Sequence, residues 1–198
     1  MNKEHDELCA SPEWAALLHE NVLPLAVDRA DLGKELLEVG PGPGAATEWL
    51  RTRVDRLVAV EIEAAAAERL AARFAGTNVE VRQGSGSALE FADDSFDSAA
   101  SFTMLHHVPT VALQNRLLAE ILRVLRPGGV LVGADSLPSS PLHEFHEGDV
   151  YNPVEPAAFL TRLQTLGYVD ITLGVTTGLT FSAHKPPEPE PEPEPAVS

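Results

Sequence analysis

The sequence predicts an α/β protein whose open, doubly wound sheet of seven mostly parallel strands ends in an antiparallel C-terminal hairpin. Short apolar segments alternate with helical segments from about residue 35 to residue 166, which is typical of parallel strands joined by helices. Residues 168–173 and 179–183 are then two strand-like segments with no helix between them. Consecutive strands joined by a short turn pair antiparallel, so we expect a hairpin at the sheet edge.

The elements are placed by local patterns. Parallel strands are expected where apolar residues run together. The first ends at Val39, the second ends at Val60, and the other three cover residues 79–81, 95–102 and 130–134. Helices are expected where apolar residues recur every three to four positions or alanine dominates, over 14–18, from 45 to about 53, and over 64–74, 113–125 and 155–166. Ser11-Pro12 should begin the first helix, and Pro127-Gly128-Gly129 should end the fourth.

The segment Leu36-Leu37-Glu38-Val39-Gly40-Pro41-Gly42-Pro43-Gly44 is the most informative in the chain. It is predicted to be the end of a buried strand followed by a tight glycine turn that leads into a helix. Glycine reaches dihedral angles closed to other residues and lets the backbone approach a ligand closely. A strand, a glycine loop and a helix in this order indicate a cofactor site.

A second acid supports this interpretation. About seventeen residues after Gly44, the apolar strand Arg56-Leu57-Val58-Ala59-Val60 ends in Glu61. A carboxylate in that position accepts hydrogen bonds from the two hydroxyls of an adenosine ribose. A solvated loop carboxylate beside a plain turn is the alternative.

Five motifs in register resemble those of class I S-adenosylmethionine-dependent methyltransferases. They are Glu38-x-Gly40-x-Gly42-x-Gly44, Glu61, residues 83–97, Leu105-His106-His107-Val108 and residues 123–129, which together extend over about half of the chain. The family usually has Asp where this chain has Ser85 and Pro where it has Glu90. That Asp normally accepts a hydrogen bond from the adenine amino group, so Ser85, Ser87 or backbone must make this contact.

The resemblance implies a Rossmann-like fold with S-adenosylmethionine as the cofactor. The glycine turn should wrap its amino-acid end, and the acid that ends strand two should bind both ribose hydroxyls. The segments after strands two and three should contact adenine, and the backbone after strand four should pass the methionine portion. The expected cofactor-binding residues are Glu38, Gly40, Pro41, Gly42, Glu61, Ile62, Ser85, Gly86, Phe102 and Thr103.

Candidate acceptor-binding residues follow strands four and five, where loops carry specificity in such folds. They are Trp14, His106, His143, His146 and Tyr151, and His106 and His143 are also candidate catalytic bases. We expect His106 and the 143–151 loop to form opposite walls of the cleft. Packing or turn capping is the plain alternative for His106, and a solvated loop is the alternative for the others.

No metal is expected. His143, His146 and Glu147 have a spacing that could hold one, but this pattern is weaker than the helical His-Glu-x-x-His zinc motif.

The composition limits which classes of molecule can be partners of this protein. The formal net charge of −16 disfavours nucleic acid and anionic membranes, since proteins that neutralise phosphates are basic. Residues 1–7 lack the pattern of a signal peptide, no segment is long and apolar enough to span a bilayer, and Cys9 is the only cysteine. We therefore expect a cytoplasmic protein with a neutral or cationic small-molecule acceptor.

The chain is expected to form one S-adenosylmethionine-binding methyltransferase domain over residues 1–184. Residues 185–198 are rich in Pro and Glu, which alternate from 187 to 195, so they should be a disordered, extended tail that contributes nothing to folding.

The expected function is methyl transfer from S-adenosylmethionine to a small-molecule acceptor by in-line displacement. Two alternatives stay open: a nicotinamide-dependent oxidoreductase, and a catalytically silent protein that binds an adenosyl cofactor. Against the oxidoreductase, no second substrate domain follows, and the loop reads Gly-x-Gly-x-Gly with two prolines.

Overall fold

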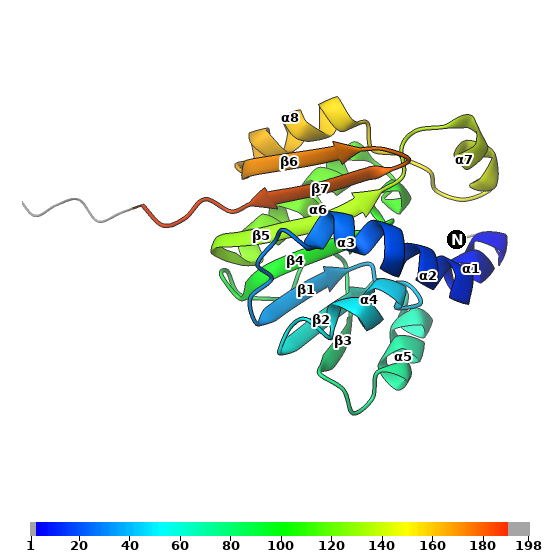
Figure 1. Ribbon diagram of the computed structural model, residues 1–198, viewed down its shortest axis with the longest axis horizontal. Helices are drawn as coiled ribbons and strands as arrows, with labels where there is room; N and C mark the ends of the chain where they lie inside the picture. Colours follow the sequence, from blue (N-terminus) through cyan, green and yellow to red (C-terminus); the bar gives the residue numbers. More distant parts are fainter. Residues whose placement is uncertain (1–2, 190–198) are drawn as a thin grey trace, which may run out of the picture.

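The computed structural model describes residues 3–189, which form a seven-stranded sheet covered by helices (Figure 1). The strands lie in the order β3-β2-β1-β4-β5-β7-β6. Their bounds are β1 Glu35–Val39, β2 Arg56–Glu61, β3 Val79–Gln83, β4 Phe96–Phe102, β5 Leu125–Asp135, β6 Val169–Val175 and β7 Leu179–His184. The first five strands pair in parallel, and β7 pairs antiparallel with both β5 and β6. The predicted sheet and hairpin are confirmed, with β7 inserted between β5 and the edge strand β6.

Helical segments make up most of the remaining regular structure. They are α1 Lys3–Cys9, α2 Pro12–Leu17, the π-helix η1 Leu18–Val22, α3 Leu23–Val27, α4 Ala45–Leu50, α5 Ala64–Arg73, the 3₁₀ turn η2 Leu105–His107, α6 Val111–Val124, α7 Ser140–Phe145 and α8 Pro156–Leu166. Ser11 caps α2 by accepting a hydrogen bond from Trp14 N at 3.1 Å, with Pro12 in the first turn, as the sequence predicts. Gly167, with φ of +100°, ends α8 in the left-handed conformation that favours glycine.

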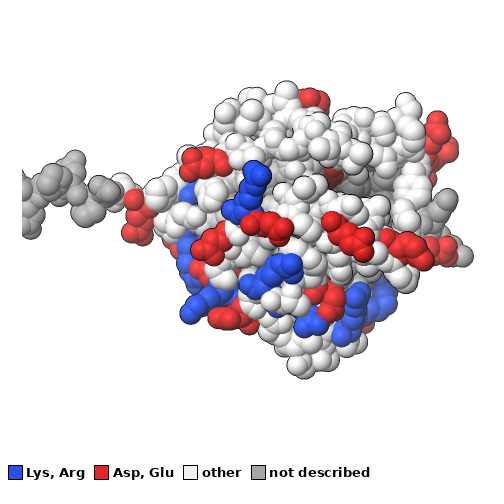
Figure 2. Space-filling view, in the orientation of Figure 1, with Lys and Arg blue, Asp and Glu red and all other residues white. Residues whose placement is uncertain are grey.

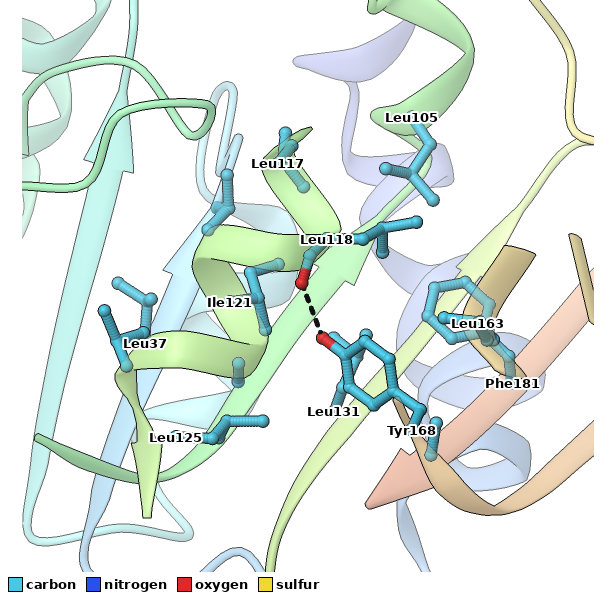
Figure 3. Close-up of a cluster of buried hydrophobic side chains, with 14 of the residues drawn as sticks. Leu37, Leu105, Leu117, Leu118, Ile121, Leu125, Leu131, Leu163, Tyr168 and Phe181 are labelled. Atoms are coloured by element: carbon cyan, nitrogen blue, oxygen red, sulfur yellow. Dashed lines mark hydrogen bonds between the residues drawn. The ribbon is translucent and has the colours of Figure 1, made fainter. Parts of the chain in front are cut away.

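The two faces of the sheet bury separate apolar clusters because consecutive strand residues point to opposite sides. Leu36 packs with α3, α4 and α5, whereas the next residue, Leu37, packs with α6 and α8. Figure 3 shows the second cluster, where the Tyr168 hydroxyl donates a 2.9 Å hydrogen bond to the Leu118 carbonyl inside α6. Both faces are thus covered, which explains why most residues of the central strands are buried.

The order of the strands opens a crevice at one end of the sheet. Strand β1 lies between β2 and β4, so the chain winds outward in opposite directions from β1. Ligands in open α/β sheets bind at the carboxyl ends of the strands where the order reverses in this way. Helices α1, α2 and α7 all lie at that end of the sheet in Figure 1.

Three local predictions differ from the structure. Strand β5 begins at Leu125 rather than at residue 130, so helix α6 ends at Val124 and the Pro127-Gly128-Gly129 segment lies within the strand. The N-terminal region holds four short helical segments rather than one, and the loop after β5 contains α7. In α7, Pro141 occupies the first turn, and Ser139 accepts a weak 3.4 Å hydrogen bond from Leu142 N.

Charged residues of both signs lie side by side on one part of the surface. On the face shown in Figure 2, Lys and Arg side chains lie among Asp and Glu mainly in the lower half of the view, and the upper part is mostly uncharged. Among the described residues, no helix is both long and apolar enough to cross a membrane.

Lys185, the first residue of the predicted tail, is held against the sheet. Its Nζ donates to Asp94 Oδ1 at 2.7 Å and to the Leu125 carbonyl at 2.8 Å, and its backbone N–H donates to Gly129 O at 2.9 Å. Residues 186–189 have no regular structure, and the rest of the predicted tail, residues 190–198, lies outside the described residues.

Two truncations test where the folded part of the chain ends. A chain that ends after Lys185 should keep the melting temperature of the full chain, because the contacts above are retained. A chain that ends after His184 loses the five hydrogen bonds that Lys185 makes, including one from Gly128 N to its carbonyl. At about 1 kcal/mol each, and with each kcal/mol worth about 2–4 °C for a domain of this size, the melting temperature should fall clearly. Thermal unfolding followed by circular dichroism measures both, and a large loss on the longer truncation would show that the Pro-Glu segment docks.

Candidate functional site

The glycine turn after β1 adopts backbone conformations that require glycine. Gly40, Gly42 and Gly44 have φ angles of +72°, +52° and +88°. A Cβ on Gly40 would meet Met104 Cγ at 2.1 Å, and one on Gly44 would meet Leu70 Cδ1 at 2.6 Å. A Cβ on Gly42 would meet no atom within 4 Å. The first and last glycines therefore permit close packing, and the middle one exposes bare backbone to open space.

Glu61 joins the end of β2 to this turn. Its carboxylate accepts a hydrogen bond from Gly42 N at 3.2 Å and another from Glu63 N at 3.1 Å. The side chain is thus fixed at the rim of the crevice, although only 7% of the residue is exposed. Two backbone donors hold the carboxylate where the sequence places a ribose-binding acid.

Glu38, near the end of β1, is fully enclosed. Thr47 Oγ1 of α4 donates a 2.6 Å hydrogen bond to Glu38 Oε2, and 1% of the residue is exposed. Burial raises the pKa of the Glu38 carboxyl to about 7, the Thr47 hydrogen bond opposes this rise, and the Glu61 charge adds to it. Near neutral pH this carboxyl can therefore take up or release a proton when a charged ligand approaches.

The segment after β3 forms a compact turn beside the same crevice. Ser85 Oγ lies 3.0 Å from Ser87 Oγ, and Ala88 N donates to Ser85 O at 3.0 Å. A Cβ on Gly86 would meet Val39 Cγ1 at 2.5 Å, so glycine is needed for this close approach. Ile62 is 63% exposed, which leaves an apolar side chain available to cover a flat ligand.

One cavity of about 620 Å³ connects these features. All ten sequence-predicted cofactor residues line it. Thr103 has a positive φ of +51°, uncommon for a residue other than glycine, and its N–H donates to Ala134 O at 2.7 Å. This bend at the end of β4 passes the backbone of residues 102–103 along the cavity wall.

The remaining lining is mostly apolar and comes from other elements. Trp14 of α2, predicted for the acceptor side, lines this cavity. Further lining residues include Cys9, Leu18, Met104, Val108, Pro109, Leu113 and Leu117, as well as His107 beside the predicted His106, and Asp149 and Val150 of the predicted 143–151 loop. The cavity volume is within the range of small-molecule sites.

The predicted acceptor histidines do not line this cavity. The 3₁₀ turn of η2 directs His106 to Asp135, whose Oδ1 lies 2.6 Å from His106 Nδ1, and 2% of His106 is exposed. Its neighbour His107 lines the cavity instead. Burial, helped by the nearby His106, lowers the pKa of His107 to about 3, so its imidazole is neutral at physiological pH.

Of the two walls expected for the acceptor, His106 lies outside this cavity, whereas Asp149 and Val150 of the 143–151 loop line it. His106 and His146 lie side by side with ring centroids 5.1 Å apart, and His146 is 4.6 Å from Tyr151. His143 and Tyr151 line a separate, shallower hollow at α7. The residues after α7 pack against η2: Tyr151 lies 6.1 Å from His106 between ring centroids, and Asn152 N donates to the His106 carbonyl at 2.7 Å.

Two residues missed from the sequence organise this region. Asp135, the last residue of β5, accepts from Leu105 N at 2.9 Å and Ser136 N at 2.7 Å in addition to its contact with His106. The sequence did carry a signal for Asp135, because it is an acid at the carboxyl end of a predicted strand, as Glu61 is. His5 of α1 lies 4.8 Å from His107 and 4.6 Å from His146 between ring centroids, and no local sequence signal links these positions.

A glycine turn, an acid at the end of β2 and a cavity between them define a nucleotide-cofactor-binding protein of the Rossmann-like class. Residues 37–133 match the family model described as a methyltransferase domain. A protein of Mycolicibacterium smegmatis named a probable S-adenosylmethionine-dependent methyltransferase is 31% identical over 159 residues, 74% of this chain and 56% of that protein. The phthiotriol/phenolphthiotriol dimycocerosates methyltransferase of Mycobacterium leprae is 30% identical over 77% of this chain and 53% of its own length.

Among solved structures, a Haloferax volcanii methyltransferase in complex with the Trm112 methyltransferase activator matches with a TM-score of 0.71. The match covers 94% of this chain and 99% of that one at 18% identity, which shows the shared fold. The chain belongs to the S-adenosylmethionine-dependent methyltransferase family that its sequence motifs resemble, and S-adenosylmethionine is the cofactor of that family. It spans about half the length of the curated relatives it matches.

The buried Glu38 carboxyl predicts a specific dependence of stability on pH. Its pKa is about 7 in the folded protein and 4.5 as the ordinary value, so between these pH values the folded state holds a proton that the unfolded state has released. Stability from this group is therefore present below about pH 4.5 and is lost as the pH rises through about 7. Over that window Glu38→Gln should gain on the order of 3 kcal/mol relative to wild type.

Urea unfolding of both proteins at several pH values measures this difference. Glu68→Gln, on the exposed surface of α5, removes the same charge without burial and should follow the wild-type profile. Parallel profiles for wild type and Glu38→Gln would contradict the assignment.

Proposed function

We propose that this chain transfers a methyl group from S-adenosylmethionine to a small-molecule acceptor by in-line displacement. The observation that supports it best is the cavity at the carboxyl ends of β1, β2 and β4, lined by all ten expected cofactor residues and by an apolar set from α1, α2, α6 and the loop after α7. The proposal thus assigns both reactants to one enclosed space.

The part of the cavity that we assign to the cofactor matches the chemical groups of S-adenosylmethionine. Bare backbone at Gly42 leaves room beside the Glu61 carboxylate, which retains acceptor capacity beyond its two backbone donors for ribose hydroxyls. Ser85 and Gly86 would border adenine, with Ile62 over its face. The backbone at Thr103 would follow the methionine portion, and Glu38 would face its ammonium group.

The acceptor end favours an uncharged or cationic organic molecule. Trp14, Leu113 and Val150 offer apolar surface, and Asp149 adds an acidic side chain at the same cavity. The net charge of −16 acts against anionic acceptors. The relative named for phthiotriol and phenolphthiotriol dimycocerosates is consistent with an acceptor that has a large apolar part.

The cofactor, when bound, supplies a methyl group on a positively charged sulfur, which is already an activated leaving group. The chain then has to hold the acceptor atom in line with that bond and exclude water, so proximity and orientation account for most of the rate. His107 borders the cavity, but burial lowers its pKa to about 3, so its imidazole is too weak a base to take a proton from the acceptor, and we assign it no role in proton transfer.

Replacing Glu61 tests the cofactor half of the proposal. Glu61→Ala removes a carboxylate that is held at the cavity, and losing a charged hydrogen-bond partner costs about 1.5–3 kcal/mol. S-adenosylhomocysteine should therefore bind roughly ten- to a hundredfold more weakly in calorimetry. Glu68→Ala should bind it as wild type does, and NAD in a parallel titration should not bind measurably. Unchanged affinity in Glu61→Ala would remove this residue from the site.

The two tryptophans provide a matched test of the acceptor half. Trp14 lines the cavity, whereas Trp49 of α4 packs against Arg53, whose guanidinium lies 3.0 Å from the ring centroid. With a radiolabelled methyl donor and an acceptor found by screening, Trp14→Ala should lower kcat/KM by roughly tenfold through lost apolar contact. Trp49→Ala should retain the wild-type value when corrected for folded protein. Cofactor binding without methyl transfer to any acceptor would favour the catalytically silent alternative.

A further inference from the structure

Four histidines from three distant segments meet beside the cavity. This histidine cluster consists of His5 in α1, His106 and His107 in η2, and His146 just after α7. One ring nitrogen from each lies within 4.8 Å of those of the others. Three of the four side chains are buried, and His107 is half-buried at the cavity.

The rings are oriented by contacts on their outer nitrogens. His106 Nδ1 lies 2.6 Å from Asp135 Oδ1, and His146 Nδ1 lies 2.6 Å from the Leu142 carbonyl. These contacts leave the Nε2 atoms of both rings for the interior of the cluster. His146 Nε2 is buried and has no hydrogen-bond partner among the described residues. A buried nitrogen in this state requires an explanation, because desolvation without a partner is costly.

We propose that the histidine cluster binds one zinc ion as a closed, structural site. Zinc takes four ligands in a tetrahedron, and imidazole nitrogen is one of its common ligands. Bonds of about 2.0–2.1 Å place the four nitrogens about 3.4 Å apart, so the rings need to close by on the order of 1 Å. Rotations of the side chains supply this movement.

The surroundings match those of known kinds of zinc sites. A histidine that binds zinc usually donates its other nitrogen to a carboxylate or a backbone carbonyl, which fixes the tautomer. Asp135 and the Leu142 carbonyl are partners of these two types. Burial keeps His5 and His107 uncharged at neutral pH by lowering their pKa to about 4 and about 3, and zinc binds the uncharged form of imidazole.

The ion would join three segments that are far apart in the sequence. It would fasten α1 and the end of α7 to η2, next to the cavity wall that His107 provides. The site differs from the His143-His146-Glu147 pattern, because His146 alone belongs to both. It does not depend on the proposed methyl transfer.

The experiment uses the full chain after treatment with a chelator and dialysis. Calorimetric titration with Zn²⁺ should give one ion per chain, and titration with Co²⁺ should give the intense visible absorption of a tetrahedral complex. His107→Gln and His146→Gln should each weaken Zn²⁺ binding by at least about a hundredfold, given that loss of an outer partner already costs 10–100-fold. Asp135→Asn should weaken it by roughly 10–100-fold at unchanged stoichiometry.

His143→Gln is the matched control, because it lies one turn from His146 on the same segment, outside the histidine cluster. It should keep the wild-type affinity for Zn²⁺. S-adenosylhomocysteine affinity and circular dichroism of each chelated variant report folding separately, and His5→Gln near the N-terminus replaces any variant that fails to fold. Substoichiometric or absent Zn²⁺ binding, ligand variants that bind as wild type does, or loss of binding in His143→Gln would each overturn the proposal.

Discussion

The backbone turn from Gly40 to Gly44 is the constraint on which the rest of the site depends. Its positive φ angles turn the chain within five residues, and side chains from the segment after β4 and from α5 pack where a Cβ would otherwise stand. Met104 fills the space at Gly40, and Leu70 fills the space at Gly44. The ends of β1, β2 and β4 can thus converge on one cavity without a side chain from the turn blocking it.

Two carboxyls of different character flank this turn. Glu61 is fixed by backbone donors at the rim, and Glu38 is buried with a hydroxyl partner and a raised pKa. The two carboxyls can lie on either side of the turn because the turn residues contribute backbone N–H groups and no further acidic side chain. The cost of burying Glu38 is consistent with a group kept for a ligand rather than for stability, as functional sites often show.

Features set by neighbours in sequence were predictable, and features set by distant packing were not. The glycine run, Glu61 and the alternating strands each carry a local pattern, and the ten residues that the family resemblance implied all line one cavity. Which of two adjacent histidines faces the cavity depends on the η2 turn and on Asp135, about thirty residues away along the chain. The packing of the residues after α7 against η2, and the arrival of His5 from the N-terminus, follow from tertiary contacts that no period or spacing records. The start of β5 at Leu125 was missed because Pro and Gly usually end regular structure, whereas here they lie within the first residues of a strand.

The antiparallel course of β7 has a practical consequence. Because it runs against β5, the chain leaves the sheet at the end opposite the cavity, where Lys185 is anchored beside Gly129. The first helix, by contrast, lies at the cavity end (Figure 1). An affinity handle, a fluorescent reporter or a surface linker fused after the last strand would therefore leave the cavity accessible, whereas the same addition before α1 would sit beside its entrance.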